Sequence, residues 1–179
     1  MTRFKLTSAL ILTLIAIIFS AAPVDARSPY KGQKSIGLYG GYSTNTESAV
    51  AGLYYQYRFT RALRIAPSVD YVFRSKNQDS YNFDFNVHFP IRLDAADNAN
   101  FYPIAGLGYS AIYHRCNDSN LTVYDATDSS HRYDRVGINL GGGFEYFVNS
   151  TLRVAVEGKW RLREDYSTGL FTVAIGYRF

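Results

Sequence analysis

The sequence predicts an all-β fold, a transmembrane up-and-down antiparallel β-barrel of about eight strands. Three observations support this prediction. The C-terminal residues 169–179 alternate large apolar side chains with small or polar ones and stop at an aromatic residue, Phe179. Stretches of about ten residues with the same period-two alternation recur along the chain. Tyrosine, phenylalanine and glycine occur 16, 12 and 14 times, a composition that favours strands and tight turns over helices.

The N-terminus has the organisation of a secretory signal peptide. Arg3 and Lys5 precede an apolar run over residues 9–19, and Val24 and Ala26 stand at the −3 and −1 positions of a cleavage site. An uncleaved anchor helix is the alternative, but the run is shorter than the roughly 20 residues that span a bilayer. We therefore expect Sec-type export with signal cleavage near Ala26.

Three segments follow from this division of the chain. Residues 1–26 form the expected signal peptide, residues 27–33 a short polar lead, and residues 34–179 the β-barrel domain. The single cysteine, Cys116, excludes an intrachain disulfide. Stability must therefore come from packing and hydrogen bonds.

Each expected strand presents apolar side chains on one face and small, polar or charged ones on the other, because successive side chains of a strand point to opposite sides. The fourth strand shows the cleanest alternation, with Phe83, Phe85 and Val87 on one face and Asp84 and His88 on the other. An even number of strands brings both termini to the same side of the barrel. The expected strands cover residues 34–42, 48–59, 63–73, 81–91, 101–113, 135–147, 152–162 and 169–179.

The connections between these strands divide into two sets. With periplasmic termini, the turns on the periplasmic side cover residues 60–62, 94–100 and 149–151. The extracellular loops cover residues 43–47, 74–80, 114–134 and 164–168. The longest connection, 114–134, falls on the outer side, where such barrels carry their longer loops.

The polar faces of the strands carry charges of both signs. The interior of an eight-stranded barrel is only wide enough for side chains to fill it, so opposite charges can pair there while glycines leave room for long arginines. A soluble calycin-like barrel is the alternative, but the strands are longer than is usual in globular sheets, and closure removes the strand edges that hydrocarbon cannot tolerate. The predicted structural lumen network consists of Arg58, Arg64, Asp70, Asp84, His88, Arg92, Glu145, Arg153, Glu157, Lys159, Arg161 and Arg178.

The chain resembles small bacterial outer-membrane barrels, the outer membrane protein β-barrel domain or porin-like proteins of OmpA/OmpX type. The residues that carry the resemblance are Val173, Ile175, Tyr177 and Phe179 with the stretches 101–109 and 137–146. The resemblance covers residues 34–179. It implies a place in the bacterial cell outer membrane, among outer-membrane lipids and lipopolysaccharide. It also implies periplasmic chaperones and insertion by the barrel-assembly machinery, which reads the C-terminal strand as an assembly signal.

Such barrels serve as adhesins, structural proteins, narrow channels and occasionally lipid enzymes, so fold alone does not assign a function. We expect a non-enzymatic protein that acts in membrane structure or in surface interaction through its extracellular loops, mainly 114–134. A narrow porin-like channel for small solutes or ions is the alternative, and a lipid-modifying outer-membrane enzyme is a third class. The sequence does not name the ligand of the loops.

The residues that could carry chemistry do not form a known catalytic or metal-binding pattern. Ser110 and His114 share a strand face but lie about 13 Å apart along it, too far for a nucleophile and its base. His114, Cys116 and His131 lack the repeated short spacing of metal ligands. We expect no catalytic residues, metal or cofactor. The net charge of +4 is spread along the chain, which does not indicate a nucleic-acid partner.

Overall fold

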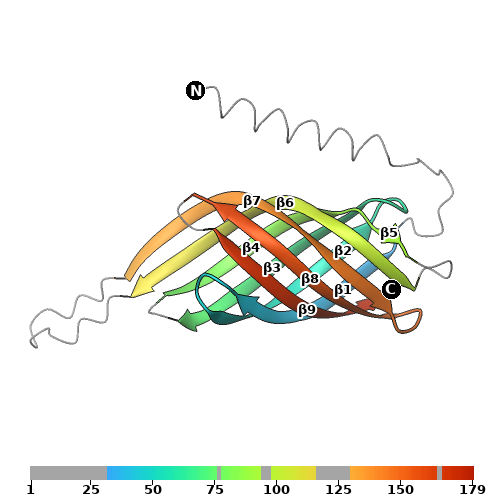
Figure 1. The fold of residues 1–179 in the computed structure, drawn as a ribbon, viewed down its shortest axis with the longest axis horizontal. Coiled ribbons are helices and arrows are strands. Elements are labelled where there is room, and N and C mark those ends of the chain that lie inside the picture. The colour runs from blue at the N-terminus through green and yellow to red at the C-terminus, as the bar shows by residue number, and fades with distance from the viewer. Residues whose placement is uncertain (1–31, 76–77, 94–97, 116–129, 165–166) are drawn as a thin grey trace, which may run out of the picture.

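The computed structural model describes residues 32–75, 78–93, 98–115, 130–164 and 167–179. The expected signal peptide and most of the polar lead lie outside these residues. Nine antiparallel strands make up the described part of the chain (Figure 1). They are β1 (Lys34–Ser43), β2 (Ser48–Arg58), β3 (Arg64–Ser75), β4 (Gln78–His88), β5 (Ile91–Arg92), β6 (Ala99–Arg115), β7 (Ser130–Phe147), β8 (Leu152–Arg163) and β9 (Thr168–Arg178).

The strands form one closed sheet. Their order is β4-β3-β2-β1-β9-β8-β7-β6-β5, and β4 also pairs with β6, which closes the sheet into a barrel. Strands β4 and β5 pair with successive parts of β6, and β5 contributes only two residues. The two strands therefore share one position in the wall, and the wall has eight strands. This architecture confirms the predicted up-and-down antiparallel barrel.

The expected strand over residues 81–91 is interrupted. Proline has no backbone N–H to donate to a neighbouring strand, and Pro90 separates β4 from β5. The Phe89 N–H still donates to the Pro103 carbonyl at 3.1 Å, so the chain stays against β6 across the break. The sequence alternation continues through this point, which is why a single strand was expected.

Two expected loops are shorter than predicted. Strands β3 and β4 extend to a Ser75–Gln78 pair, so most of the expected loop 74–80 is strand. Strands β6 and β7 pair from Ala99–Tyr146 to Arg115–Ser130 and occupy both ends of the expected loop 114–134; residues 116–129 lie outside the described residues. In Figure 1 this hairpin reaches beyond the neighbouring strands. Apolar alternation fades where both faces of a strand meet water, so it does not reveal such extensions.

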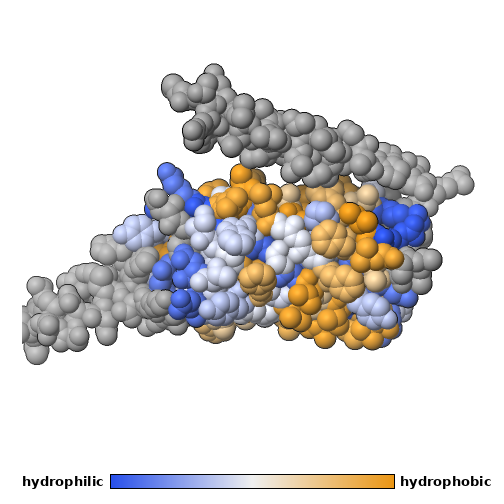
Figure 2. Space-filling model, viewed as in Figure 1, coloured by the Kyte–Doolittle hydropathy of each residue, from blue (hydrophilic) through white to orange (hydrophobic). Residues whose placement is uncertain are grey.

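The two faces of the wall differ in polarity, as the alternation predicts. The outward side chains include many exposed large apolar residues, among them Leu38, Phe83, Leu140, Val156 and Ile175. On the face seen in Figure 2, apolar side chains gather toward the end of the barrel where the C-terminus lies. No helix in the described ranges is long and apolar enough to cross a membrane.

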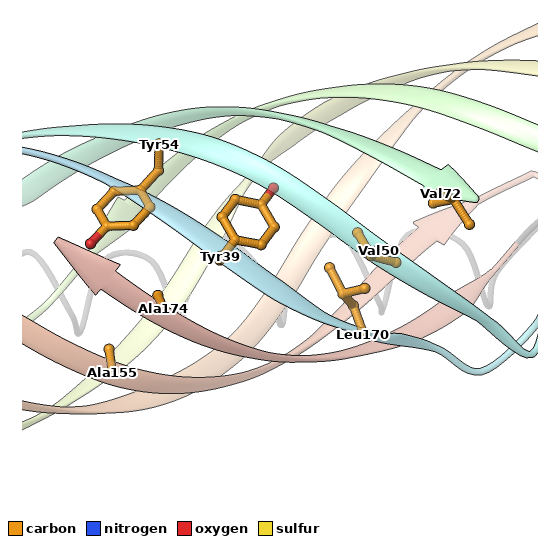
Figure 3. Close-up of a cluster of buried hydrophobic side chains, with 7 residues drawn as sticks. All are labelled: Tyr39, Val50, Tyr54, Val72, Ala155, Leu170 and Ala174. Carbon is orange, nitrogen blue, oxygen red and sulfur yellow. The ribbon is translucent and has the colours of Figure 1, made fainter.

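The inward side chains fill the lumen. A cluster of buried apolar side chains lies on one side of it (Figure 3). Its members are Tyr39, Val50, Tyr54, Val72, Ala155, Leu170 and Ala174. Most other buried residues are polar or charged, so the lumen has the composition of a polar network and not of an ordinary hydrophobic core.

The barrel closes along the seam between β1 and β9. The register pairs Leu38 with Ile175, and the last residue of the chain takes part in the seam. The Phe179 N–H donates to the Lys34 carbonyl at 2.9 Å, and the Lys34 N–H donates to the Phe179 carbonyl at 3.2 Å. The first residue of the first strand is therefore held by the final residue of the chain.

Candidate functional site

The charged side chains of the lumen form two clusters, and the first is centred on Glu145 of β7. Its carboxylate is fully buried and accepts hydrogen bonds from Arg64 Nη1 at 2.7 Å and Arg153 Nε at 2.5 Å. Asn100 Nδ2 donates to its other oxygen at 3.2 Å. We call Arg64, Asn100, Glu145 and Arg153 the Glu145 cluster. Oε1 of a second carboxylate, Glu157, lies 4.0 Å from Arg153 Nη2. The two guanidinium groups of Arg64 and Arg153 are therefore balanced by two carboxylates.

The second cluster, the Asp84 cluster, is centred on Asp84 of β4 and Asp70 of β3. Asp84 accepts from Lys159 at 2.8 Å, from Arg161 at 2.8 Å and from Arg163 at 3.3 Å. Arg161 also binds Asp70 through both of its terminal nitrogens. The three cations lie on one face of β8 because they occupy alternate positions along it.

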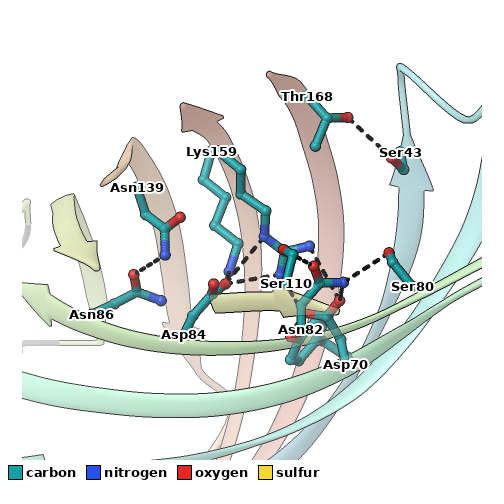
Figure 4. Close-up of polar contacts among 12 residues, drawn as sticks. Ser43, Asp70, Ser80, Asn82, Asp84, Asn86, Ser110, Asn139, Lys159 and Thr168 are labelled. Carbon is teal, nitrogen blue, oxygen red and sulfur yellow. Dashed lines mark hydrogen bonds and ion pairs between the residues drawn. The ribbon is translucent and has the colours of Figure 1, made fainter. Parts of the chain in front are cut away.

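The second cluster crosses the full width of the barrel. In the closed order of strands, β8 and β3 lie four strands apart in either direction, so the Arg161–Asp70 pair joins opposite walls. Figure 4 shows the Asp84 part of this network together with Asn82 and Ser110, which extend it by side-chain hydrogen bonds. Buried charges are tolerated when they are paired, and each cation of the two clusters forms an ion pair with a carboxylate.

Three buried tyrosines connect the ionic groups. Tyr39 donates to Asp70 at 2.7 Å, and Tyr102 donates to Glu157 at 2.7 Å. Arg153 donates to the hydroxyls of both Tyr54 and Tyr102, at 3.0 and 3.1 Å. The tyrosine hydroxyls therefore provide hydrogen-bond partners for the carboxylates of Asp70 and Glu157 and for the guanidinium of Arg153, in addition to the ion pairs.

Glycines on the neighbouring strands make room for these rings. A Cβ at Gly52 would lie 2.6 Å from the Tyr39 ring, and one at Gly143 would lie 2.5 Å from the Tyr102 ring. Gly108 and Gly137 leave space for an arginine, Arg163. The sequence had suggested that the glycines accommodate arginines, whereas most of this space holds tyrosine rings.

The structure places most of the predicted lumen residues inside the barrel. Arg92 and Arg178 lie at the rim of the barrel and not among the buried lumen residues. Arg92 is exposed on β5, because that short strand lies at the rim where side chains of either face reach solvent. Arg178 donates to the Ser150 carbonyl at 2.7 Å and lies over the Phe147 ring, also at the rim. The buried members are Arg58, Arg64, Asp70, Asp84, His88, Glu145, Arg153, Lys159 and Arg161, with Glu157 half-buried.

Several lumen residues were missed at the level of sequence. Tyr39, Tyr54 and Tyr102 were not singled out, because tyrosines also occupy the outer face. Their position in the alternation indicates the interior: Tyr39 lies between Gly37 and Gly41, two positions from each. Arg163 was missed because it follows the end of the expected strand, although it continues the spacing of Lys159 and Arg161.

His88 and Ser110 do not pair with each other as a hydrolytic nucleophile and its base would. His88 Nδ1 lies 3.2 Å from Arg64 Nη2, and its ring stacks on Tyr102. Ser110 donates to Asn82, not to a histidine. Among the described residues, no group of three His, Cys, Asp or Glu side chains gathers where a metal ion could be held.

Two further features lie on the outer surface. Near the outer end of the wall, Tyr109 donates to Asp134 at 2.7 Å, and Arg132 donates to both. These hydrogen bonds, from Tyr109 first and then from Arg132, lower the pKa of the exposed Asp134 carboxyl. A furrow of about 410 Å³ on the wall, lined by residues such as Leu53 and Val69, faces away from the lumen.

The predicted assembly-signal residues all lie on the outer face of β9 or just after it. Val173, Ile175, Tyr177 and Phe179 are each more than half exposed. They form one apolar row along the strand that closes the barrel. Recognition of this row by another protein stays a prediction.

Comparison with known proteins agrees with the fold. The sequence profile described as "Outer membrane protein beta-barrel domain" matches residues 10–179. No curated protein matches the sequence. Similar solved structures include the N-terminal β-barrel domain of OprF from Pseudomonas aeruginosa, at 14% identity and a TM-score of 0.65, which covers 83% of this chain and 98% of that one.

Two other similar structures have names that refer to attachment or to the cell surface. The attachment invasion locus protein Ail of Yersinia pestis is 15% identical, with a TM-score of 0.59, and covers 83% of this chain and 99% of its own. Neisserial surface protein A is 13% identical, with a TM-score of 0.60, and covers 82% of this chain and 95% of its own. At these identities the likeness shows the fold.

Proposed function

Because this chain belongs to the outer membrane protein β-barrel domain family, we propose that it is a sealed, non-enzymatic barrel whose extracellular loops interact with other surfaces or whose wall supports the membrane. The observation that carries the proposal is the pair of ionic clusters across the lumen. Arg153, Arg161, Asp84 and Glu145 are each at most 1% exposed, so water does not reach the charges that would line a pore.

The contents of the lumen favour the proposed function over its main rival, a narrow channel. A channel needs a continuous path, but the Arg161–Asp70 pair joins opposite walls and the tyrosines fill the space beside it. Single-channel recording in planar bilayers tests the proposal. The purified protein should give no steady openings, and Arg161→Ala should add only brief ones. Steady openings of the wild type that enlarge in Arg161→Ala would establish the channel instead.

The loops carry the proposed surface interaction. The stretch 116–129 contains Asp118, Asp125 and Asp128 and no lysine or arginine, so it suits a cationic partner. Ail has been crystallised with the heparin analogue sucrose octasulfate, which is a polyanion. The acidic composition of residues 116–129 does not favour a polyanion of this kind, which supports the proposal of a cationic partner.

A loop replacement separates surface interaction from mechanical support. Cells lacking the protein would be complemented with the full chain or with a chain in which residues 116–129 are replaced by a short Gly-Ser turn. If the loops act in surface interaction, the replaced chain restores detergent resistance but not adherence to poly-lysine-coated surfaces. Full restoration of adherence would contradict the role of the loop. Unchanged lipid A on overexpression is expected, since the protein is proposed not to modify lipids.

We also propose how the chain reaches its place. Export by a Sec-type signal with cleavage near Ala26 is supported by the N-terminal pattern, and insertion by the barrel-assembly machinery by the apolar row that ends at Phe179. Outer-membrane lipids, including lipopolysaccharide, would then cover the apolar wall. N-terminal sequencing of the protein from outer membranes tests the cleavage site, and a start at Arg27 is expected.

A further inference from the structure

A small polar cavity lies in the lumen between the two ionic clusters. Its volume is about 20 Å³, and its lining includes Tyr39, Tyr54, Gln56, Ser68 and Lys159. Figure 3 shows Tyr39 and Tyr54 following one another along the barrel beside this region. A cavity needs roughly 10–15 Å³ of such space to hold one water molecule, so this cavity has room for one water and for little else.

Two buried oxygen atoms of the lining have no hydrogen-bond partner among the described residues. They are Oε1 of Gln56 and Oγ of Ser68, on side chains that are 3% and 7% exposed. A buried polar atom without a partner is strongly unfavourable, and in folded proteins such atoms are usually satisfied by protein groups or by ordered water. Both residues line the same cavity.

We propose that this cavity binds one internal water molecule, which donates its two hydrogens to Gln56 Oε1 and Ser68 Oγ. Lys159 supplies the third hydrogen bond. Its ammonium has three N–H donors, of which one is used on Asp84 Oδ2 at 2.8 Å, and another can be donated to the water oxygen. Three hydrogen bonds are about the usual number for a buried water.

The chemistry of the lining selects water over an ion. An anion cannot donate a hydrogen bond to Gln56 Oε1, which as a carbonyl oxygen can only accept one. A cation would meet the Lys159 ammonium in the same cavity and would be repelled by it. The water therefore connects Lys159, a member of the Asp84 cluster, to the β2 and β3 wall. Glu157, which pairs with Arg153 of the Glu145 cluster, lines the same cavity, so the water lies where the two clusters meet.

Solution NMR of the refolded barrel in detergent micelles tests for the water directly. Nuclear Overhauser effects between a long-lived water and the Gln56 side-chain amide or the Ser68 backbone amide are expected. Ser68→Val, which removes the hydroxyl and fills the cavity, should abolish them. Ser80→Ala is the matched control, because Ser80 is buried, accepts from Asn82 at 3.3 Å and does not line the cavity.

Stability measurements test for the water independently, because its presence or absence decides whether Ser68→Ala destabilises or stabilises the barrel. If the water is present, Ser68→Ala removes a satisfied hydrogen bond, and the unfolding equilibrium constant should rise about three- to tenfold. If the cavity is empty, the same substitution removes an unsatisfied hydroxyl, and the constant should fall. Absence of the water signals in the wild type together with a stabilising Ser68→Ala would overturn the proposal. Neither result depends on what the extracellular loops bind.

Discussion

Replacing Asp84 by asparagine should destabilise the barrel more than any loss of a single exposed charge. The carboxylate is fully buried and accepts from Lys159, Arg161 and Arg163. Asparagine keeps the size of the side chain but removes its negative charge, which leaves Asp70 as the carboxylate that faces the three cations. Breaking a buried ion pair in this way costs about 3–5 kcal/mol.

The geometry places the expected loss at the lower end of that range. Arg161 keeps its hydrogen bonds to Asp70, so the substitution leaves Lys159 and Arg163 as the cations without an anionic partner among the described residues. We therefore expect a loss of about 3 kcal/mol in the free energy of unfolding. With a urea dependence of about 1–3 kcal/mol per molar, the unfolding midpoint should fall by roughly 1–3 M.

The assay can use the natural fluorescence of the protein. Trp160 is the single tryptophan of the chain and is 54% exposed on the outer face of β8, so its emission reports transfer from lipid to water. Unfolding in urea would be followed for the protein refolded into phospholipid vesicles. Asp134→Asn, in an ion pair that is half exposed, is the control and should leave the midpoint nearly unchanged.

A compensating substitution tests the reason for the loss. Adding Lys159→Met to Asp84→Asn removes one of the unpaired cations, and the double variant should recover part of the lost stability. A wild-type midpoint for Asp84→Asn, or no recovery in the double variant, would refute the view that paired charges hold the lumen together.

Substitution of Val87 or Leu140, both on the outer face, by arginine should lower the free energy of unfolding by roughly 2–4 kcal/mol, measured by urea unfolding from vesicles. Equal folding yields for these variants and the wild type would contradict the assignment of the faces. Deletion of Phe179 should slow assembly in cells, since it removes the pair with Lys34 at the seam; unchanged amounts in the outer membrane would argue against it. Tyr109→Phe should raise the pKa of Asp134 toward its ordinary value in an NMR titration, because the first of the hydrogen bonds that lower it is lost, and an unmoved titration midpoint would show that this bond does not form in solution.

The alternation of side chains predicts most of this fold because the outer and inner faces meet different surroundings along the whole wall. It fails where that contrast ends. Pro90 interrupts a strand without changing the pattern, so the sequence extended one strand too far and placed Arg92 inside. Above the wall both faces are polar, and the extensions of β6 and β7 toward Arg115 and Ser130 could not be recognised.

The lumen could be predicted in composition but not in its pairs. Alternation puts Asp70, Asp84 and Arg161 on inner faces, yet which of them meet depends on the stagger between strands that are far apart in the sequence. The roles of Tyr39 and Tyr54 depend on the same stagger, since each ring takes the space left by a glycine on another strand. No local pattern encodes that arrangement.

The seam between β1 and β9 has a consequence for biogenesis. Lys34 is synthesised well before Phe179, yet the backbones of these two residues are hydrogen-bonded to each other. Until β9 has been synthesised, β1 lacks the neighbour that closes the barrel, and hydrocarbon does not accept such an unpaired strand edge. We therefore expect the wall to close only once β9 has been made, and the strands to enter the bilayer together and not one hairpin at a time.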